Sequence, residues 1–175
     1  ATLRSLQFTS RFIEKNDLLV PLFASKWNKR EKIAEIDEST YDPNADEWLR
    51  DGGVPTSLDA YREFTKILTV TEPDRNTGIV TVSINWHNPQ EAAQWANELV
   101  RDLNQEIRAR DVREANNAIS FLQQQLRNTQ LVDMQRVFYQ LIESQTRITM
   151  LADVRDEYVF RVIDPAVVPD SKIAP

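Results

Sequence analysis

The 175-residue sequence has no cysteine, one histidine and only 3 glycines. The lack of cysteine excludes disulfide frameworks, thiolate zinc sites and cysteine nucleophiles. Three glycines leave little from which to build the glycine-rich loops that bind phosphate groups through close backbone approach. A formal net charge of -6 counts against a nucleic-acid surface that neutralises phosphates. Nucleic acid is therefore not an expected partner, and nucleotide binding is disfavoured.

Long hydrophobic runs are also missing. No stretch approaches the roughly twenty apolar residues that span a bilayer, and the N-terminus lacks the basic and apolar pattern of a signal peptide. The length suits one compact domain or a small domain that carries an extended element. Because the chain opens inside an expected helix and closes on Pro175, we expect it to be a segment of a longer protein.

The first half of the sequence predicts short elements. A loose helical period predicts a helix over residues 3–14, and Pro21 is typical of the first turn of a second helix. No period is sustained in the polar, acidic stretch 27–53, where we expect short helices and loops. Thr56 and Ser57 are preferred capping residues and predict a further helix. The residues that this helix would bury are Leu58, Tyr61 and Phe64.

A β-hairpin and a long helix follow. Residues 67–72 and 79–86 flank a turn-forming sequence, and apolar and polar residues alternate in the second strand. Asn88 then favours a helix cap and Pro89 the first helical position. A helix from Pro89 to residue 127 measures roughly 58 Å at about 1.5 Å per residue.

A second long helix is expected over residues 131–152, after the break at 128–130. The long helix shows the spacing of a coiled-coil seam at four positions: Ala115, Ile119, Leu122 and Leu126. The expected seam of the second helix comprises Met134, Phe138, Leu141, Ile148 and Ala152. The two helices therefore predict an antiparallel hairpin, of which only the outer part is a two-helix arm. The first half of the long helix is expected to pack on the base through Trp95, Leu99 and Leu103.

Together these elements predict an α+β fold, in which a small mixed α/β base domain carries a long protruding antiparallel helical hairpin. The expected division is a base over residues 1–88, the long helix and hairpin arm over 89–153, and a return strand with a proline-bearing tail over 154–175. The return strand itself is predicted over residues 158–163.

An acidic stretch resembles the opening of a calcium-binding loop. Asp42, Asn44 and Asp46 alternate as calcium ligands do, but Glu47 stands where the loop needs glycine and Gly53 where it needs glutamate. We interpret this stretch as a solvated acidic loop. No metal-binding residues or cofactors are expected.

His87 is the only histidine, which excludes zinc sites with two imidazoles and would place any serine triad around this residue. It lies at a predicted strand-to-helix junction, where an imidazole more often satisfies a local backbone group. No activating motif surrounds Ser83. We therefore expect no catalytic residues and a protein that is not an enzyme.

Surplus apolar side chains are the more informative feature. A two-helix hairpin buries one seam per helix, yet four apolar residues fall beside the seam and Val112 lies in the slip between its two halves. Either a wide seam or neighbouring subunits would cover them. These candidate subunit contacts are Val112, Phe121, Val132, Tyr139 and Ile142.

Three segments of the sequence carry a family resemblance. Residues 82–96 read VSINWHNPQEAAQWA, residues 115–126 read ANNAISFLQQQL, and residues 160–169 read FRVIDPAVVP. Together with the opening over residues 3–24, they resemble the Wzz-type chain-length determinants, also called polysaccharide co-polymerases.

The resemblance implies a bacterial inner-membrane protein whose periplasmic domain is flanked by two transmembrane helices that this chain does not contain. Family members carry an α/β base and a helical arm and assemble side by side into a ring. They regulate the length of surface polysaccharide such as O antigen, which a membrane polymerase builds on a lipid-linked carrier, without chemistry of their own. The expected partners are therefore a second copy of the chain, the membrane polysaccharide polymerase and the lipid-linked glycan.

Two departures from the family pattern accompany the resemblance. The early strand that family members place before the first helix is missing, so the sheet is expected to be incomplete, and the arm is short. The polysaccharide, the subunit number, the specified length and the presence of a kinase partner stay open. The alternative function is a hairpin-type periplasmic adaptor of an export system, against which the few glycines count. A hydrolase with a helical insertion is the third interpretation.

Overall fold

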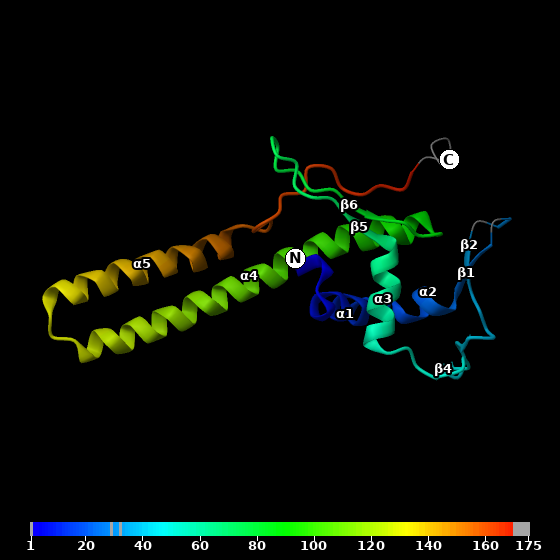
Figure 1. Cartoon of the computed structure of the whole chain (residues 1–175), viewed down its shortest axis with the longest axis horizontal. Coiled ribbons are helices and arrows are strands. Elements are labelled where there is room, and N and C mark those ends of the chain that lie inside the picture. Colours follow the sequence, from blue (N-terminus) through cyan, green and yellow to red (C-terminus); the bar gives the residue numbers. More distant parts are fainter. Residues whose placement is uncertain (1, 29, 32, 170–175) are drawn as a thin grey trace. The chain divides into compact units, whose positions relative to one another are not determined.

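The computed structural model describes residues 2–28, 30–31 and 33–169 and shows an α+β fold of helices and small antiparallel strand pairs (Figure 1). The chain divides into two compact units. The first unit comprises Ala1–Leu99 and Pro165–Pro175, and the second comprises Val100–Asp164. The division falls within the longest helix, α4 (Pro89–Asn128).

Short helices form the interior of the first unit. A 3₁₀ turn (Thr2–Arg4) precedes α1 (Leu6–Lys15), α2 (Leu19–Ala24) and α3 (Ser57–Ile67). Helix α1 packs against α3, where the rings of Phe12 and Phe64 lie 5.5 Å apart between centroids. The largest fully buried side chains of this unit are Phe12, Phe64, Ile13, Leu99 and Thr9. The helices predicted from periodicity and from Pro21 are therefore confirmed, with shifted bounds.

The start of α3 shows why its sequence folds locally. Thr56 Oγ1 accepts a hydrogen bond from the Asp59 N–H at 3.2 Å, and Asp59 Oδ2 accepts one from the Thr56 N–H at 3.1 Å. This reciprocal capping box satisfies two backbone donors that the first helical turn leaves unpaired. The predicted cap is confirmed, and Phe64 is fully buried. The predicted burial of Leu58 is wrong, because this side chain is exposed in the first turn of α3.

Two small strand pairs replace the short helices expected over residues 27–53. Strand β1 (Ser25–Asn28) pairs with β2 (Ile33–Ile36), and β3 (Tyr41–Asp42) pairs with β4 (Glu47–Trp48), both antiparallel. Asn28 Oδ1 accepts from the N–H groups of Arg30 and Glu31, and Asp42 Oδ1 from those of Asn44 and Ala45. Such side-chain bonds to the backbone favour turns over helices. Strands of four and two residues are too short for an apolar period to reveal them.

The predicted hairpin after α3 is confirmed but shorter than expected. Strand β5 (Leu68–Val70) pairs with β6 (Val82–Ile84) in antiparallel register. In the connection, Asp74 Oδ1 accepts from the N–H groups of Asn76 and Thr77, and Gly78 has a φ of 69°. A positive φ of this kind suits glycine, which has no side chain to clash.

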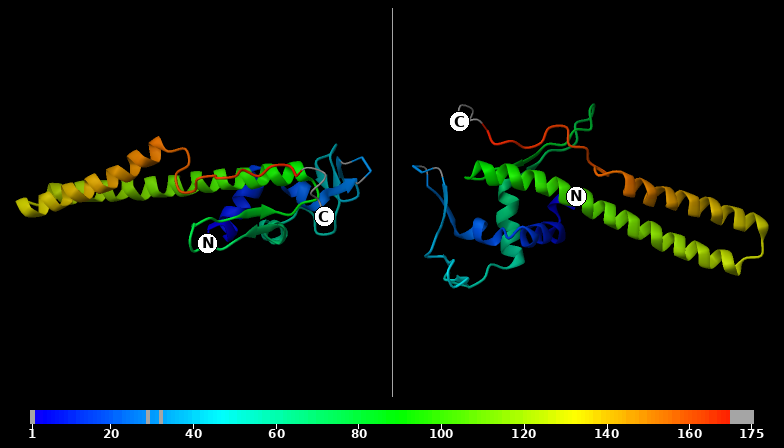
Figure 2. Two further views of the ribbon diagram at one scale, coloured as in Figure 1. Left: turned by 90° about the horizontal axis from the view of Figure 1, so that it is seen from above. Right: turned by 180° about the vertical axis from the view of Figure 1, so that it is seen from behind.

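Two helices make up most of the second unit. They are the remainder of α4 and helix α5 (Val132–Val154), and both helices were predicted with nearly these bounds. Asn88 Oδ1 accepts from the Gln90 N–H at 3.1 Å, which confirms the predicted cap of α4. In the ribbon, α5 runs back along the second part of α4 (Figures 1 and 2). That these helices form a protruding hairpin arm stays a prediction.

The segment after α5 differs from its prediction. Residues 158–163 form no strand; they are irregular, and a side chain of α4, Asn104, hydrogen-bonds their backbone. The predicted return strand is therefore wrong. The missing strand partner is replaced by an amide side chain, which a pattern of apolar residues cannot reveal.

Candidate interaction surface

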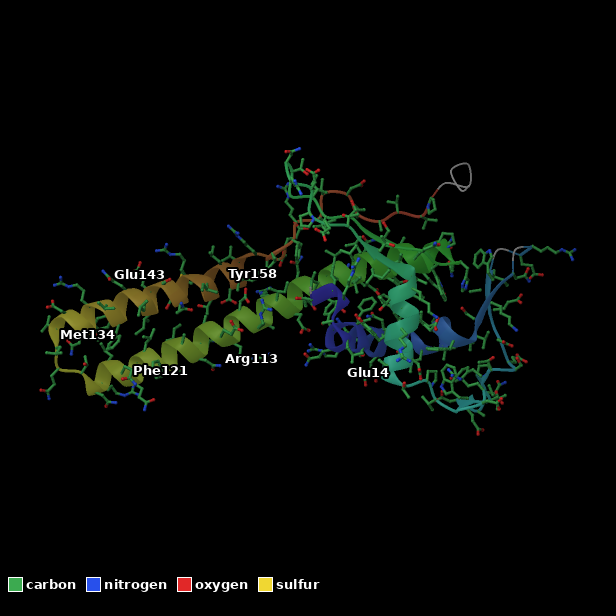
Figure 3. The ribbon with its side chains drawn as sticks, in the orientation of Figure 1. Glu14, Arg113, Phe121, Met134, Glu143 and Tyr158 are labelled. Atoms are coloured by element: carbon green, nitrogen blue, oxygen red, sulfur yellow. The ribbon has the colours of Figure 1, made fainter. Side chains whose placement is uncertain are left out.

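Exposed apolar side chains are the main feature of α4 and α5. Phe121 is 60% exposed, Val132 69% and Tyr139 61%, whereas Val112 and Ile142 are partly buried. Figure 3 shows the side chains along both helices, with Phe121 marked on α4. All five predicted contact residues therefore belong to the second unit, and the three largest exposures are those of residues predicted to lie beside the seam.

Helical geometry separates these residues into different faces. Val132 and Tyr139 are seven residues apart on α5, which is about two turns and places them on the same side of the helix. Val112 and Phe121 are nine residues apart on α4, about two and a half turns, so they lie on opposite sides of it. The predicted residues therefore do not form one continuous patch.

A groove near the end of α5 was not predicted. It is open to solvent, has a volume of about 480 Å³ and is lined by residues at the spacing of one helical face: Glu143, Thr146, Arg147, Met150, Leu151 and Val154. Met150 is 63% exposed and Val154 83%. An ion pair joins Arg147 and Glu143 at 3.4 Å along its edge. The spacing of three and four residues is visible in the sequence and is the signal that could have predicted this face.

Few side chains are buried in the described part of the second unit. The buried ones are Leu103, Asn104, Ala115 and Ala152. Ala115 and Ala152 occupy predicted seam positions, but Met134 and Leu141, also predicted for the seam, are exposed. Burial along the predicted seam of α5 is therefore partial, since Phe138 and Ile148 are partly buried, and other large apolar side chains stay at the surface.

A different cluster surrounds His87 in the first unit. Ser25 Oγ lies 3.1 Å from His87 Nε2, and the same hydroxyl donates to the Pro21 carbonyl at 2.6 Å. A hydroxyl has one proton, so the histidine Nε2–H donates to the serine oxygen. In a hydrolase the histidine would instead accept the serine proton. This geometry fixes β1 beside the start of α4 and does not activate a nucleophile.

Aromatic rings complete the cluster. The ring centroids of His87 and Trp86 lie 4.1 Å apart, and Trp86 Nε1 donates to Glu91 Oε2 at 2.7 Å. Burial lowers the pKa of His87 below its usual 6.5, and the nearby negative charge of Glu91 opposes this shift. Among the described residues, no carboxylate hydrogen-bonds the other ring nitrogen. Ser25 as the partner was missed, because 62 residues separate it from His87.

The acidic stretch that resembles a calcium loop makes local bonds. Asp42 Oδ1 accepts from two backbone N–H groups of its own turn, and Asp46 accepts from the hydroxyl of Tyr41. Within residues 2–28, 30–31 and 33–169, no three side chains of types that bind metals come together. Likewise, none of the helices in this part of the chain has the length and hydropathy needed to cross a bilayer.

Comparison with known proteins finds no matching family model, no matching curated protein and no matching solved structure.

Proposed function

We propose that the chain is the periplasmic domain of a non-enzymatic regulator of bacterial surface polysaccharide length, of the O-antigen type. It acts as an oligomeric scaffold together with a membrane polymerase and its lipid-linked glycan. Flanking segments outside this chain anchor it in the inner membrane. The sequence resemblance supplies the function, and the exposed apolar side chains of α4 and α5 support the scaffold role.

The single observation that carries the proposal is the exposure of Phe121 and Tyr139. Each is an aromatic side chain that leaves more than half of its surface in water, at 60% and 61% exposure. Aromatic residues are enriched at interfaces, because a rigid ring buries a large area at low cost in conformational entropy. In the proposed ring, α4 and α5 form an antiparallel arm, and these side chains contact the arms of neighbouring subunits.

Substitutions at the two aromatic residues test the interface. Phe121→Asp and Tyr139→Asp place a charge where the proposed contact is apolar, so we expect an altered distribution of polysaccharide length in cells that express the full-length protein. The melting temperature should change by about 2 °C or less, because both side chains are already exposed. Gel electrophoresis of the extracted polysaccharide reports the distribution.

Matched controls use neighbouring exposed residues on the same helices. Gln124→Asp on α4 and Gln140→Asp on α5 add the same charge at exposed positions beside the aromatic ones. We expect normal polysaccharide length in both. Unaltered length in the two aromatic variants, at normal expression, would remove these residues from the interface.

The assembly state tests the scaffold itself. Light scattering of the full-length protein in mild detergent should give a homo-oligomer, since membrane anchoring concentrates the subunits. A monomer under these conditions would contradict the proposed function, whatever the effect of the aromatic substitutions.

A further inference from the structure

Asn104 of α4 binds a separate stretch of backbone within the second unit. Its Oδ1 accepts from the Phe160 N–H at 2.8 Å and from the Val159 N–H at 3.1 Å. Its Nδ2 donates to the Phe160 carbonyl at 2.8 Å. The side-chain amide thus pairs with the N–H and C=O of one residue, as a neighbouring strand would. Asn104 is only 5% exposed, so losing these bonds would leave a buried polar group unpaired.

The bound backbone lies shortly after the end of α5 at Val154. Near it, burial and then the negative charge of Asp111 of α4 raise the pKa of Tyr158, and the Val162 N–H donates to Glu157 Oε1 at 3.0 Å. The side chains of Val159 and Phe160 are themselves exposed. The segment is therefore attached to α4 chiefly through its backbone, with little apolar packing.

Contacts between the helices themselves are sparse at this end. Ala152 is the only buried residue of α5 in the described chain. The ion pair from Arg108 to Asp153 is 3.9 Å long, and the aspartate is exposed, so it contributes little to stability. At the opposite end of α5, Gln135 Nε2 donates to the Thr129 carbonyl at 3.0 Å across the connection from α4.

We propose that the Asn104 hydrogen bonds keep the C-terminal end of α5 beside α4. When these bonds are formed, they and the short connection after α4 hold α5 at both of its ends. When the bonds are broken, α5 is attached to α4 chiefly through the connection, and it pivots there. The Asn104 bonds therefore determine which apolar side chains of the two helices face each other and which face solvent.

In the first unit, a second asparagine of α4 binds backbone in the same way. Asn97 Nδ2 donates to the Ala166 carbonyl and Asn97 Oδ1 accepts from the Ala166 N–H, both at 2.9 Å. Asn97 and Asn104 are seven residues apart on α4, about two helical turns. Two asparagines of α4 therefore each hydrogen-bond the N–H and C=O of one residue after α5, and the two sets of bonds are separate.

Pulsed EPR on the full chain tests the role of Asn104 directly, because it measures the distance between labels on α4 and α5. The sequence has no cysteine, so cysteines introduced at the exposed positions Asn117 on α4 and Ser144 on α5 are the only sites for nitroxide labels. We expect a narrow distance distribution in the labelled parent. Asn104→Leu keeps the size of the side chain but removes its hydrogen bonds, and we expect a broad distribution shifted to longer distances. Asn116→Leu, a change at an exposed asparagine of the same helix, should leave the distribution narrow.

Amide hydrogen exchange gives a second readout. In Asn104→Leu the N–H groups of Val159 and Phe160 should exchange about tenfold faster or more, since each loses its acceptor. Asn104→Ala removes the same three hydrogen bonds with a smaller side chain, so it should also broaden the distance distribution and deprotect both amides. An unchanged distribution in Asn104→Leu would overturn the proposal. If Asn104→Leu does not fold, an unchanged distribution in a folded Asn104→Ala would overturn it as well.

Discussion

The two units of the chain bury very different kinds of side chain. The first unit encloses whole aromatic rings: Phe12 and Phe64 are at most 2% exposed and contact each other. In the described part of the second unit, the largest buried side chain is Leu103, while the aromatic ring of Phe121 is 60% exposed. One unit therefore draws its stability from an apolar interior. The other depends on helix formation and hydrogen bonds, which leaves its apolar side chains available to partners.

The largest expected effect compares one phenylalanine from each unit. Phe64→Ala should lower the free energy of unfolding by about 3–5 kcal/mol, because it deletes a fully buried ring and leaves a cavity. Phe121→Ala should lower it by about 0.5 kcal/mol or less, since most of that ring is already in water. Urea unfolding followed by tryptophan fluorescence measures the loss in Phe64→Ala, because all four tryptophans lie in the first unit.

Helix α5 needs its own measurement in the same experiment. Far-UV circular dichroism at the same urea concentrations measures the loss in Phe121→Ala, because α4 and α5 contain most of the helical residues of the chain. If Phe121→Ala lowered the free energy of unfolding as much as Phe64→Ala does, the contrast between the units would fail. Such a result would show that the Phe121 ring is covered in solution.

Helices α3 and α4 could be predicted from the sequence, because each begins at residues that favour a helix start. Asn88 and Pro89 marked the start of α4, and the apolar period after them, with a slip of one residue, predicted a helix close to the observed 40 residues. Thr56 marked the start of α3 in the same way. These signals are local, because a cap and its helix lie within a few residues of each other.

The elements that were missed depend on partners distant in the sequence. Asn104 hydrogen-bonds the backbone of a residue 56 positions later, and Ser25 hydrogen-bonds His87, which lies 62 positions later. Neither pair belongs to a spaced motif, so nothing in the sequence order points to it. The exposure of Met134 and Leu141 was missed for a related reason. A periodic apolar row shows which face of a helix is apolar, but not whether another helix lies against it.

A moderate effect is expected at the cap of α3. Thr56→Ala removes one half of the capping box and should lower the free energy of unfolding of the first unit by about 1 kcal/mol. Ser120→Ala, at an exposed position within α4, should change stability by about 0.5 kcal/mol or less, in the stabilising direction, because alanine favours helix. Chemical denaturation of both variants measures the difference. Equal losses would mean that α3 does not depend on its cap.

The smallest expected effect is a pH dependence confined to the first unit. Burial lowers the pKa of His87 in the folded state, so the unfolded chain binds a proton more readily once the pH falls below about 6.5. Stability should therefore be constant above that pH and decrease below it. His87→Gln should remove the decrease between pH 7.5 and 5.5, where the ordinary carboxyl groups stay ionised. Urea midpoints from tryptophan fluorescence at the two pH values measure it. Because His87 is the only histidine, a decrease of unchanged size in His87→Gln would contradict the assignment to the imidazole. A decrease seen by fluorescence and absent from far-UV circular dichroism, in which α4 and α5 contribute most of the helical signal, would show that the two units unfold separately.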